Sequence, residues 1–147
     1  MLPEHIELEI VTPEKYVLSE TVESVEIPGK EGYLGVLPGH APLLTELGIG
    51  TLVYRKGSQL HYAAVMNGYA EVLPGRVIVL ADVCERAEEV DVERARAAVE
   101  RARAALGKGP SADDWDRANL ALNRALTRLY AASKGGGSSA AANASHS

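Results

Sequence analysis

The apolar residues of this chain change their spacing once, near residue 90, and that change limits the folds open to it. Before residue 90 they alternate with polar residues, as in Ile6, Leu8 and Ile10. A period of two indicates half-buried β-strands. Turn-forming sequences separate the alternating runs: Pro28-Gly29, Lys56-Gly57-Ser58, Asn67-Gly68 and Pro74-Gly75. The pattern predicts about nine short strands in roughly 83 residues, and hence an antiparallel β-sandwich or flattened barrel.

Beyond residue 90 the apolar residues recur at spacings of three and four, which is typical of helices packed on one side. The run from Asp91 to Leu106 is rich in Ala, Arg and Glu, all strong helix formers. A Gly/Pro break follows. Ser111, with Asp114 three residues later, predicts the start of a second helix from about Ala112 to Ser133. Because the connection is short, we expect an antiparallel helical hairpin.

The predicted contact stripes of the two helices contain many alanines. They are Val92, Ala95, Val99, Ala102 and Leu106 on the first helix, and Trp115, Ala118, Leu122, Leu126 and Leu129 on the second. Alanine buries little apolar area per contact. We therefore expect the docked hairpin to be only marginally favoured and able to open.

The charge of the chain changes sign at the same place. Residues 1–90 hold 6 Lys/Arg against 14 Asp/Glu, a net charge of −8, and residues 91–147 hold 9 against 6, a net charge of +3. The patterns divide the chain into a β unit (1–86), a helical hairpin (87–134) and a Gly/Ser/Ala-rich segment (135–147). The composition of the last segment is typical of a flexible tail.

Two features bear on the environment of the chain. The single cysteine, Cys84, excludes an internal disulfide, which suits a reducing cytosol. No apolar run approaches the length of a bilayer span, and the N-terminal segment lacks the layout of a signal peptide. We expect a soluble protein that reaches a membrane only through a partner.

One Gly-rich stretch, Glu31 to Gly50, raises the question of an active site, because it contains His40 beside a glycine. It lacks the phosphate-binding sequences G-x-x-x-x-G-K-[ST] and G-x-G-x-x-G, and the nucleophile elbow G-x-S-x-G. The histidines of the chain show no H-x-H spacing for a metal centre. We interpret the stretch as tight turns that contain one polar histidine, with no metal and no catalytic residue.

The same stretch, EGYLGVLPGHAPLLTEL, resembles the signature of the epsilon subunit of bacterial F-type ATP synthase. The segments NGYAEVLPGRVIVLADVCERAEEVDVERARAAVERA and DWDRANLALNRALTRL also match that family in order and spacing. The resemblance covers roughly residues 4–132. It implies an α+β fold, in which an N-terminal β-sandwich of about ten strands precedes a C-terminal helical hairpin.

The resemblance also implies a role. Such subunits are non-catalytic and sit on the rotating central stalk with the gamma subunit, above the c-ring, as peripheral proteins at the cytoplasmic face of the cell membrane. They help couple hydrogen ion transport to ATP synthesis. In many members the hairpin extends along gamma toward the beta subunits and inhibits ATP hydrolysis. Glu31, Gly32 and Tyr33 match the part that faces the c-ring, and His40 matches a position near gamma. Tyr33 stands where some relatives carry an acidic residue.

Arginines on the second helix suggest a further site. Arg117, Arg124 and Arg128 are spaced by seven and four residues, so they share one helix face, and Asp91 and Arg94 share a face of the first helix. Guanidinium groups suit a triphosphate, because they offer paired donors to its oxygens. The alternatives are a solvated arginine face, or a contact with acidic surfaces of the beta subunits when the hairpin extends.

The resemblance supports regulatory ATP, because some family members bind it through an I/L-D-x-x-R-A motif and arginines of the second helix. The motif here begins with Val90 in place of Ile or Leu. The implied ATP-binding residues are Glu85, Val90, Asp91, Arg94, Ala95, Arg117, Arg124 and Arg128. No general base or magnesium ligand set is evident, so this ATP would be sensed and not hydrolysed, and no cofactor is required. The alternative function is a stand-alone β-sandwich module or enzyme with a helical appendage.

Overall fold

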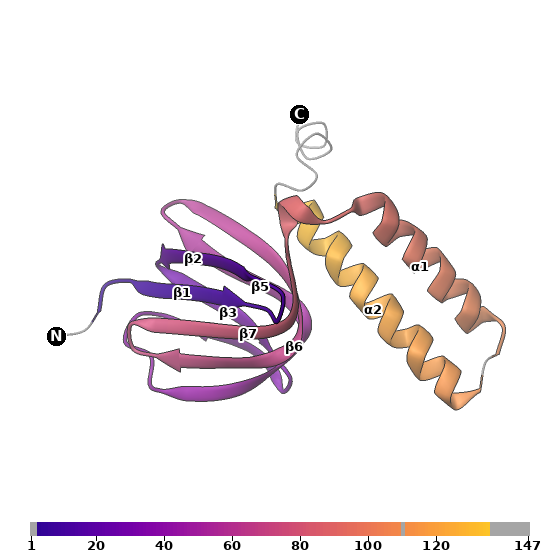
Figure 1. The fold of residues 1–147 in the computed structure, drawn as a ribbon, viewed down its shortest axis with the longest axis horizontal. Helices are drawn as coiled ribbons and strands as arrows, with labels where there is room; N and C mark the ends of the chain where they lie inside the picture. Colours follow the sequence, from indigo (N-terminus) through magenta and orange to yellow (C-terminus); the bar gives the residue numbers. More distant parts are fainter. Residues whose placement is uncertain (1–2, 110, 136–147) are drawn as a thin grey trace. The chain divides into compact units, whose positions relative to one another are not determined.

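The computed structural model describes residues 3–109 and 111–135. The chain forms two compact units, one that ends at Glu85 and one that begins at Arg86 (Figure 1). Most of the segment expected to be a flexible tail, residues 136–147, lies outside the described residues.

The first unit is a seven-stranded sheet in the order β2-β1-β7-β6-β5-β3-β4. Its strands are β1 (Ile6–Val11), β2 (Tyr16–Val22), β3 (Ser24–Gly29), β4 (Gly32–Val36), β5 (Leu43–Lys56), β6 (Gln59–Leu73) and β7 (Arg76–Arg86). Strand β1 is antiparallel to β2 but parallel to β7. The sheet is therefore mixed, whereas the alternation predicted a purely antiparallel one. The exception is the pair formed by the first and last strands, which lie side by side and run in the same direction.

The sheet folds over and encloses one hydrophobic core, which confirms the predicted β-sandwich (Figure 1). The core is built from the inward-facing alternate residues of all seven strands. Its largest fully buried side chains are Ile6, Leu8, Ile10, Ile27, Leu47 and Leu52. Each such side chain stabilises the fold by about 1.5–3 kcal/mol relative to an exposed position.

The strands are fewer and longer than the nine or ten expected. Strands β5 and β6 have 14 and 15 residues and pair along nearly their whole length. The Asn67-Gly68 pair, predicted as a turn, lies inside β6. Asn67 keeps a turn-like backbone with φ 60°, but the pairing with β5 continues on both sides of it. Gly68 is required because a Cβ there would overlap the Leu80 carbonyl oxygen of β7.

The second unit consists of a short 3-10 turn, η1 (Ala87–Glu89), and two helices, α1 (Val92–Gly107) and α2 (Ala112–Lys134), which pack as the predicted hairpin (Figure 1). The Asp91 carboxylate caps α1 by accepting a hydrogen bond from the Arg94 N–H at 3.1 Å. The Ser111 hydroxyl caps α2 by accepting from the Asp114 N–H at 3.3 Å. The start signal read at Ser111 is confirmed.

The buried side chains of the hairpin are small. They are Ala95, Val99 and Ala102 on α1, and Ala118, Ala125, Ala131 and Ala132 on α2. The predicted stripe of α2 is wrong at Trp115 and Leu126, which are 48% and 40% exposed. Ala118 and Ala125 are seven residues apart, so they recur on one face and let the two helices approach closely. The larger side chains of Trp115 and Leu126 lie on a neighbouring face of α2 and stay exposed.

Candidate functional site

One side of the sheet of the first unit carries exposed apolar side chains, where polar ones are the rule. Leu44 is 69% exposed, Tyr69 53% and Leu80 54%. In the ladder Leu44 lies opposite Glu71 and Tyr69 lies opposite Glu46, so each pair leaves the same side of the sheet. We refer to the surface made by these five residues as the outer face.

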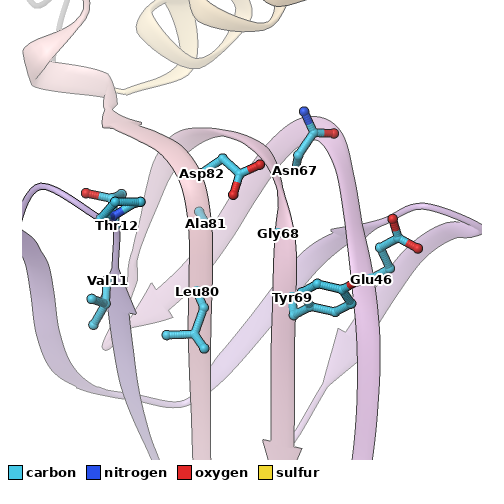
Figure 2. A pocket seen from close by; sticks show the side chains of 10 residues that line it. Val11, Thr12, Glu46, Asn67, Gly68, Tyr69, Leu80, Ala81 and Asp82 are labelled. Carbon is cyan, nitrogen blue, oxygen red and sulfur yellow. The ribbon is translucent and has the colours of Figure 1, made fainter.

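A hollow of ≈ 580 Å³ lies on the outer face (Figure 2). Its lining residues are Val11, Thr12, Pro13, Glu46, Asn67, Gly68, Tyr69, Leu80, Ala81 and Asp82. In Figure 2 the apolar side chains of Val11 and Leu80 lie toward one end, and the polar side chains of Thr12, Asn67 and Asp82 toward the other. An open hollow with one apolar and one polar end suits side chains of a docked protein better than an enclosed small molecule.

Acidic side chains accompany these apolar residues. The Glu9 carboxylate, which points out of β1, accepts a hydrogen bond from the Tyr16 hydroxyl at 2.5 Å and pairs with Arg76. The Tyr16 hydrogen bond, followed by the one from Arg76, lowers the pKa of Glu9 below its ordinary 4.5. The same bond raises the pKa of Tyr16. Glu46 and Asp82 line the hollow itself, so acidic side chains accompany the apolar residues of the outer face.

The residues implied to face the c-ring lie at the turn between β3 and β4: Glu31 is in the turn, and Gly32 and Tyr33 begin β4. Glu31 and Gly32 lie at the exposed tip of the turn. The Lys30 N–H donates to a backbone carbonyl of β5 at 2.8 Å. Tyr33 is 58% exposed, yet its hydroxyl accepts a hydrogen bond from a backbone N–H of β5 at 3.0 Å. The turn is therefore tied to β5 on both sides.

His40 lies in the connection between β4 and β5 and is half-buried. The ring Nδ1 of His40 is 2.7 Å from the Ala41 carbonyl oxygen, and the backbone N–H of His40 donates to the Leu37 carbonyl at 3.1 Å. The neighbouring Gly39 N–H donates to the Pro74 carbonyl at 2.7 Å. The interpretation as turns is correct for this connection, but most of the stretch from Glu31 to Gly50 lies in β4 and β5. Within residues 3–109 and 111–135, no group of His, Cys, Asp and Glu side chains could hold a metal ion.

The candidate nucleotide residues of the first helix begin the second unit, whereas Glu85 lies on β7 in the first unit. Val90 and Ala95 are buried. The Asp91 carboxylate is engaged as the cap of α1, on the Arg94 N–H, and the Arg94 side chain is exposed. Asp91 and Arg94 are thus brought together at the start of α1.

The three arginines of α2 share one helix face, but they lie at different positions along the helix axis. Eleven residues separate Arg117 from Arg128, which is about 16 Å at 1.5 Å per residue. Arg117 pairs with Asp114 at 3.7 Å near the start of α2. Arg124, near the middle of α2, and Arg128, nearer its end, are half-buried. Because the helices are antiparallel, Arg124 and Arg128 lie closer than Arg117 to the start of α1.

Comparison with known proteins decides the family. The family described as ATP synthase, Delta/Epsilon chain, beta-sandwich domain matches residues 5–87, and the corresponding long alpha-helix domain matches residues 88–133. The chain belongs to the ATP synthase delta/epsilon chain family.

Relatives of this delta/epsilon chain cover nearly its whole length. It is 52% identical over 133 residues to the ATP synthase epsilon chain of Syntrophobacter fumaroxidans, covering 90% of this chain and 99% of that one. It is 49% identical over 125 residues to that of Desulforamulus reducens, covering 85% and 95%. A chain of the Euglena gracilis mitochondrial ATP synthase, OSCP/F1/c-ring in rotational state 1, superposes with a TM-score of 0.77 at 28% identity, covering 90% of this chain and 83% of that one.

These matches confirm the resemblance drawn from the sequence. As an ATP synthase delta/epsilon chain, the protein is a non-catalytic subunit of that complex and works with its other subunits. The alternative of a stand-alone module is not supported, because both units match the family. In the described part of the chain, no helix is long and apolar enough to cross a membrane.

Sequence reasoning missed the outer face of this delta/epsilon chain. Its hollow draws on β1, β5, β6 and β7, which are far apart along the chain. One signal was available in the segment Val77 to Leu80, where four apolar residues follow one another and leave no polar side for water. A strand that is apolar on both sides needs cover on both sides.

Proposed function

We propose that the outer face is the surface through which the first unit docks on the gamma subunit of the central stalk. The observation that carries this proposal is the exposure of Leu44, Tyr69 and Leu80 on one side of the sheet. Contiguous exposed apolar side chains with a polar rim are typical of protein interfaces. The acidic side chains that accompany them favour a partner with basic side chains around an apolar centre.

Leu80 and Leu60 provide a matched test of this docking. They are 54% and 51% exposed, but Leu60 lies at the far end of β6, beside the turn to β5, and outside the hollow. Leu80→Asp should weaken binding of the full chain to purified gamma at least tenfold, because it places a charge in an apolar contact. Leu60→Asp should leave binding unchanged. Equal affinities for the two variants would reject the outer face as the gamma surface.

The turn between β3 and β4 is the proposed contact with the c-ring. Glu31 and Gly32 are exposed at its tip, and backbone hydrogen bonds tie the turn to β5. A rigid, exposed, charged tip suits recognition of polar loops, because little conformational freedom is lost when it docks. His40, in the half-buried connection that follows β4, is proposed to lie near gamma and to support the local backbone.

The hairpin is the proposed regulatory element. Its small buried side chains support an equilibrium between a folded and an opened form, and a ligand stabilises the form that binds it. ATP held by Asp91, Arg94, Arg124 and Arg128 would favour the folded hairpin. At low ATP the opened helices would reach the beta subunits and inhibit hydrolysis. The complex would place this chain, as a peripheral subunit, at the cytoplasmic face of the membrane.

A further inference from the structure

The pairing between β3 and β5 is interrupted beside the proposed c-ring turn. The two strands pair where Glu26 lies opposite Val53, and again where Gly29 lies opposite Leu47. Between these points β3 has two residues, whereas β5 has five, residues 48–52. The extra residues of β5 cannot all find partners on β3, so their backbone groups need other ones.

A proline in β3 removes a further possible hydrogen bond between the two strands. Pro28 is one of the two residues of β3 in the gap, and it has no N–H to donate to β5. On its other side Pro28 lies opposite Tyr33 of β4. Tyr33 is therefore the residue next to the gap that has a side chain long enough to reach across it.

The Tyr33 phenol fills the gap. Its hydroxyl accepts a hydrogen bond from the Thr51 N–H at 3.0 Å, and Thr51 is only 5% exposed. A Cβ on the neighbouring Gly50 would lie 2.5 Å from the Tyr33 hydroxyl oxygen and 2.7 Å from the Pro28 Cβ. The phenol thus rests directly on glycine backbone, and the fit depends on the absence of a side chain at position 50.

A second connection holds the other side of the turn. The Lys30 N–H donates to the Glu46 carbonyl at 2.8 Å, and the Lys30 ammonium lies 3.3 Å from the Glu46 carboxylate. Glu31 and Gly32 are the only residues between Lys30 and Tyr33. The tip of the turn is therefore fastened to β5 immediately before and immediately after its two exposed residues.

We propose that Tyr33 is a positioning residue, whose hydroxyl replaces the missing β3–β5 ladder bond and so fixes the direction in which Glu31 is presented. This inference rests on the proposed docking of the turn on the c-ring. Tyr33 acts through the backbone of its own chain, and 58% of the residue remains exposed for a partner to cover. A residue without a hydroxyl at this position would leave the buried Thr51 N–H without its acceptor.

The first test uses the full chain alone. Tyr33→Phe keeps the ring and removes only the hydroxyl, so the unit should stay folded, while hydrogen exchange of the Thr51 amide should accelerate about tenfold. Tyr130→Phe is the matched control, since Tyr130 is 52% exposed and lies in the other unit. Unchanged exchange at Thr51 in Tyr33→Phe, relative to this control, would overturn the inference.

The second test uses the assembled ATP synthase reconstituted in vesicles and compares proton pumping with the rate of ATP hydrolysis. Tyr33→Phe should lower pumping per ATP severalfold with gamma binding unchanged, and Glu31→Ala should do the same by removing the presented charge. If Glu31→Ala impairs coupling and Tyr33→Phe does not, Tyr33 is not a positioning residue. If neither does, the proposed c-ring contact itself fails, and with it the role assigned to Tyr33.

Discussion

The Glu9 carboxylate has two partners. It accepts a hydrogen bond from the neutral Tyr16 hydroxyl and forms an ion pair with the Arg76 guanidinium. Both partners bind the ionised form, and both lower the pKa of Glu9 in the folded chain. A carboxyl group whose pKa is lowered by folding stabilises the fold above its unfolded pKa. That contribution is lost as the pH falls from the ordinary value of 4.5 through the lowered one.

Replacement of Glu9 tests this at the level of one residue. Glu9→Gln should destabilise the chain at about pH 7, and the difference from the unmodified chain should be smaller at about pH 3, below the ordinary value of 4.5, because more of the glutamate is protonated there. Urea unfolding at the two pH values measures the difference. Tyr16→Phe, which removes one of the two partners, should show part of the same pH dependence. A loss that is the same at both pH values would contradict the account.

At the scale of single elements, α2 has three distinct faces. Buried Ala118 and Ala125 lie on one face, exposed Trp115 and Leu126 lie on a second face, and arginines occupy a third. The arginine face is not uniform along its length, because Arg117 is paired with Asp114 about 16 Å from Arg128. A phosphate group at the start of α1 would therefore meet Arg124 and Arg128 first.

This asymmetry predicts unequal effects on ATP binding. Arg124→Ala and Arg128→Ala should each weaken binding about tenfold or more, because a charged hydrogen bond contributes about 1.5–3 kcal/mol. Arg117→Ala should have a smaller effect. Glu93→Ala is the control. Glu93 lies on α1, where its carboxylate pairs with Arg96 at 3.0 Å, and it is not part of the arginine face of α2. Calorimetry on the full chain measures each affinity, and equal losses in all four variants would show that the arginines do not form the phosphate site.

Structural features that depend on contacts between neighbouring residues were predictable from the sequence. Features that depend on contacts between residues far apart in the sequence were not. The start of α2 followed from Ser111 and Asp114, because capping involves only neighbours. The turn expected at Asn67 failed, since pairing with β5 and contact with β7 override the local preference. The apolar spacing placed Trp115 in the hairpin contact, but Trp115 is exposed, because the contact between the helices is made by small alanine side chains. The hollow at Asp82 needed three-dimensional information, because its walls come from separate strands.

At the scale of the whole molecule, the hydrophobic core of the sandwich contains residues of the first unit alone. The sandwich core is made of side chains up to Cys84, and the buried residues of the two helices are almost all alanines. The proposed docking surfaces all lie in the first unit, and the proposed nucleotide response depends on the second. The two activities should therefore be separable by truncation.

Deletion of residues 88–147 is the corresponding prediction. The shortened chain should still bind gamma, because the outer face is complete without the hairpin. The assembled complex should hydrolyse ATP faster than the complete one, most clearly at low ATP, while proton-driven synthesis persists. Hydrolysis rates measured across ATP concentrations test this. Identical rates for the two complexes would show that the hairpin does not inhibit this enzyme.

The parallel pairing of β1 with β7 also decides when the sandwich can be completed during synthesis. Strand β1 leaves the ribosome first, yet its neighbour on one side, β7, ends at Arg86. Until that residue has emerged, the nascent sandwich keeps an unpaired strand edge, and contacts so distant in sequence form slowly. The last step of sandwich formation should therefore coincide with synthesis of the hairpin, so that premature release of the chain before residue 86 yields an open, aggregation-prone sheet.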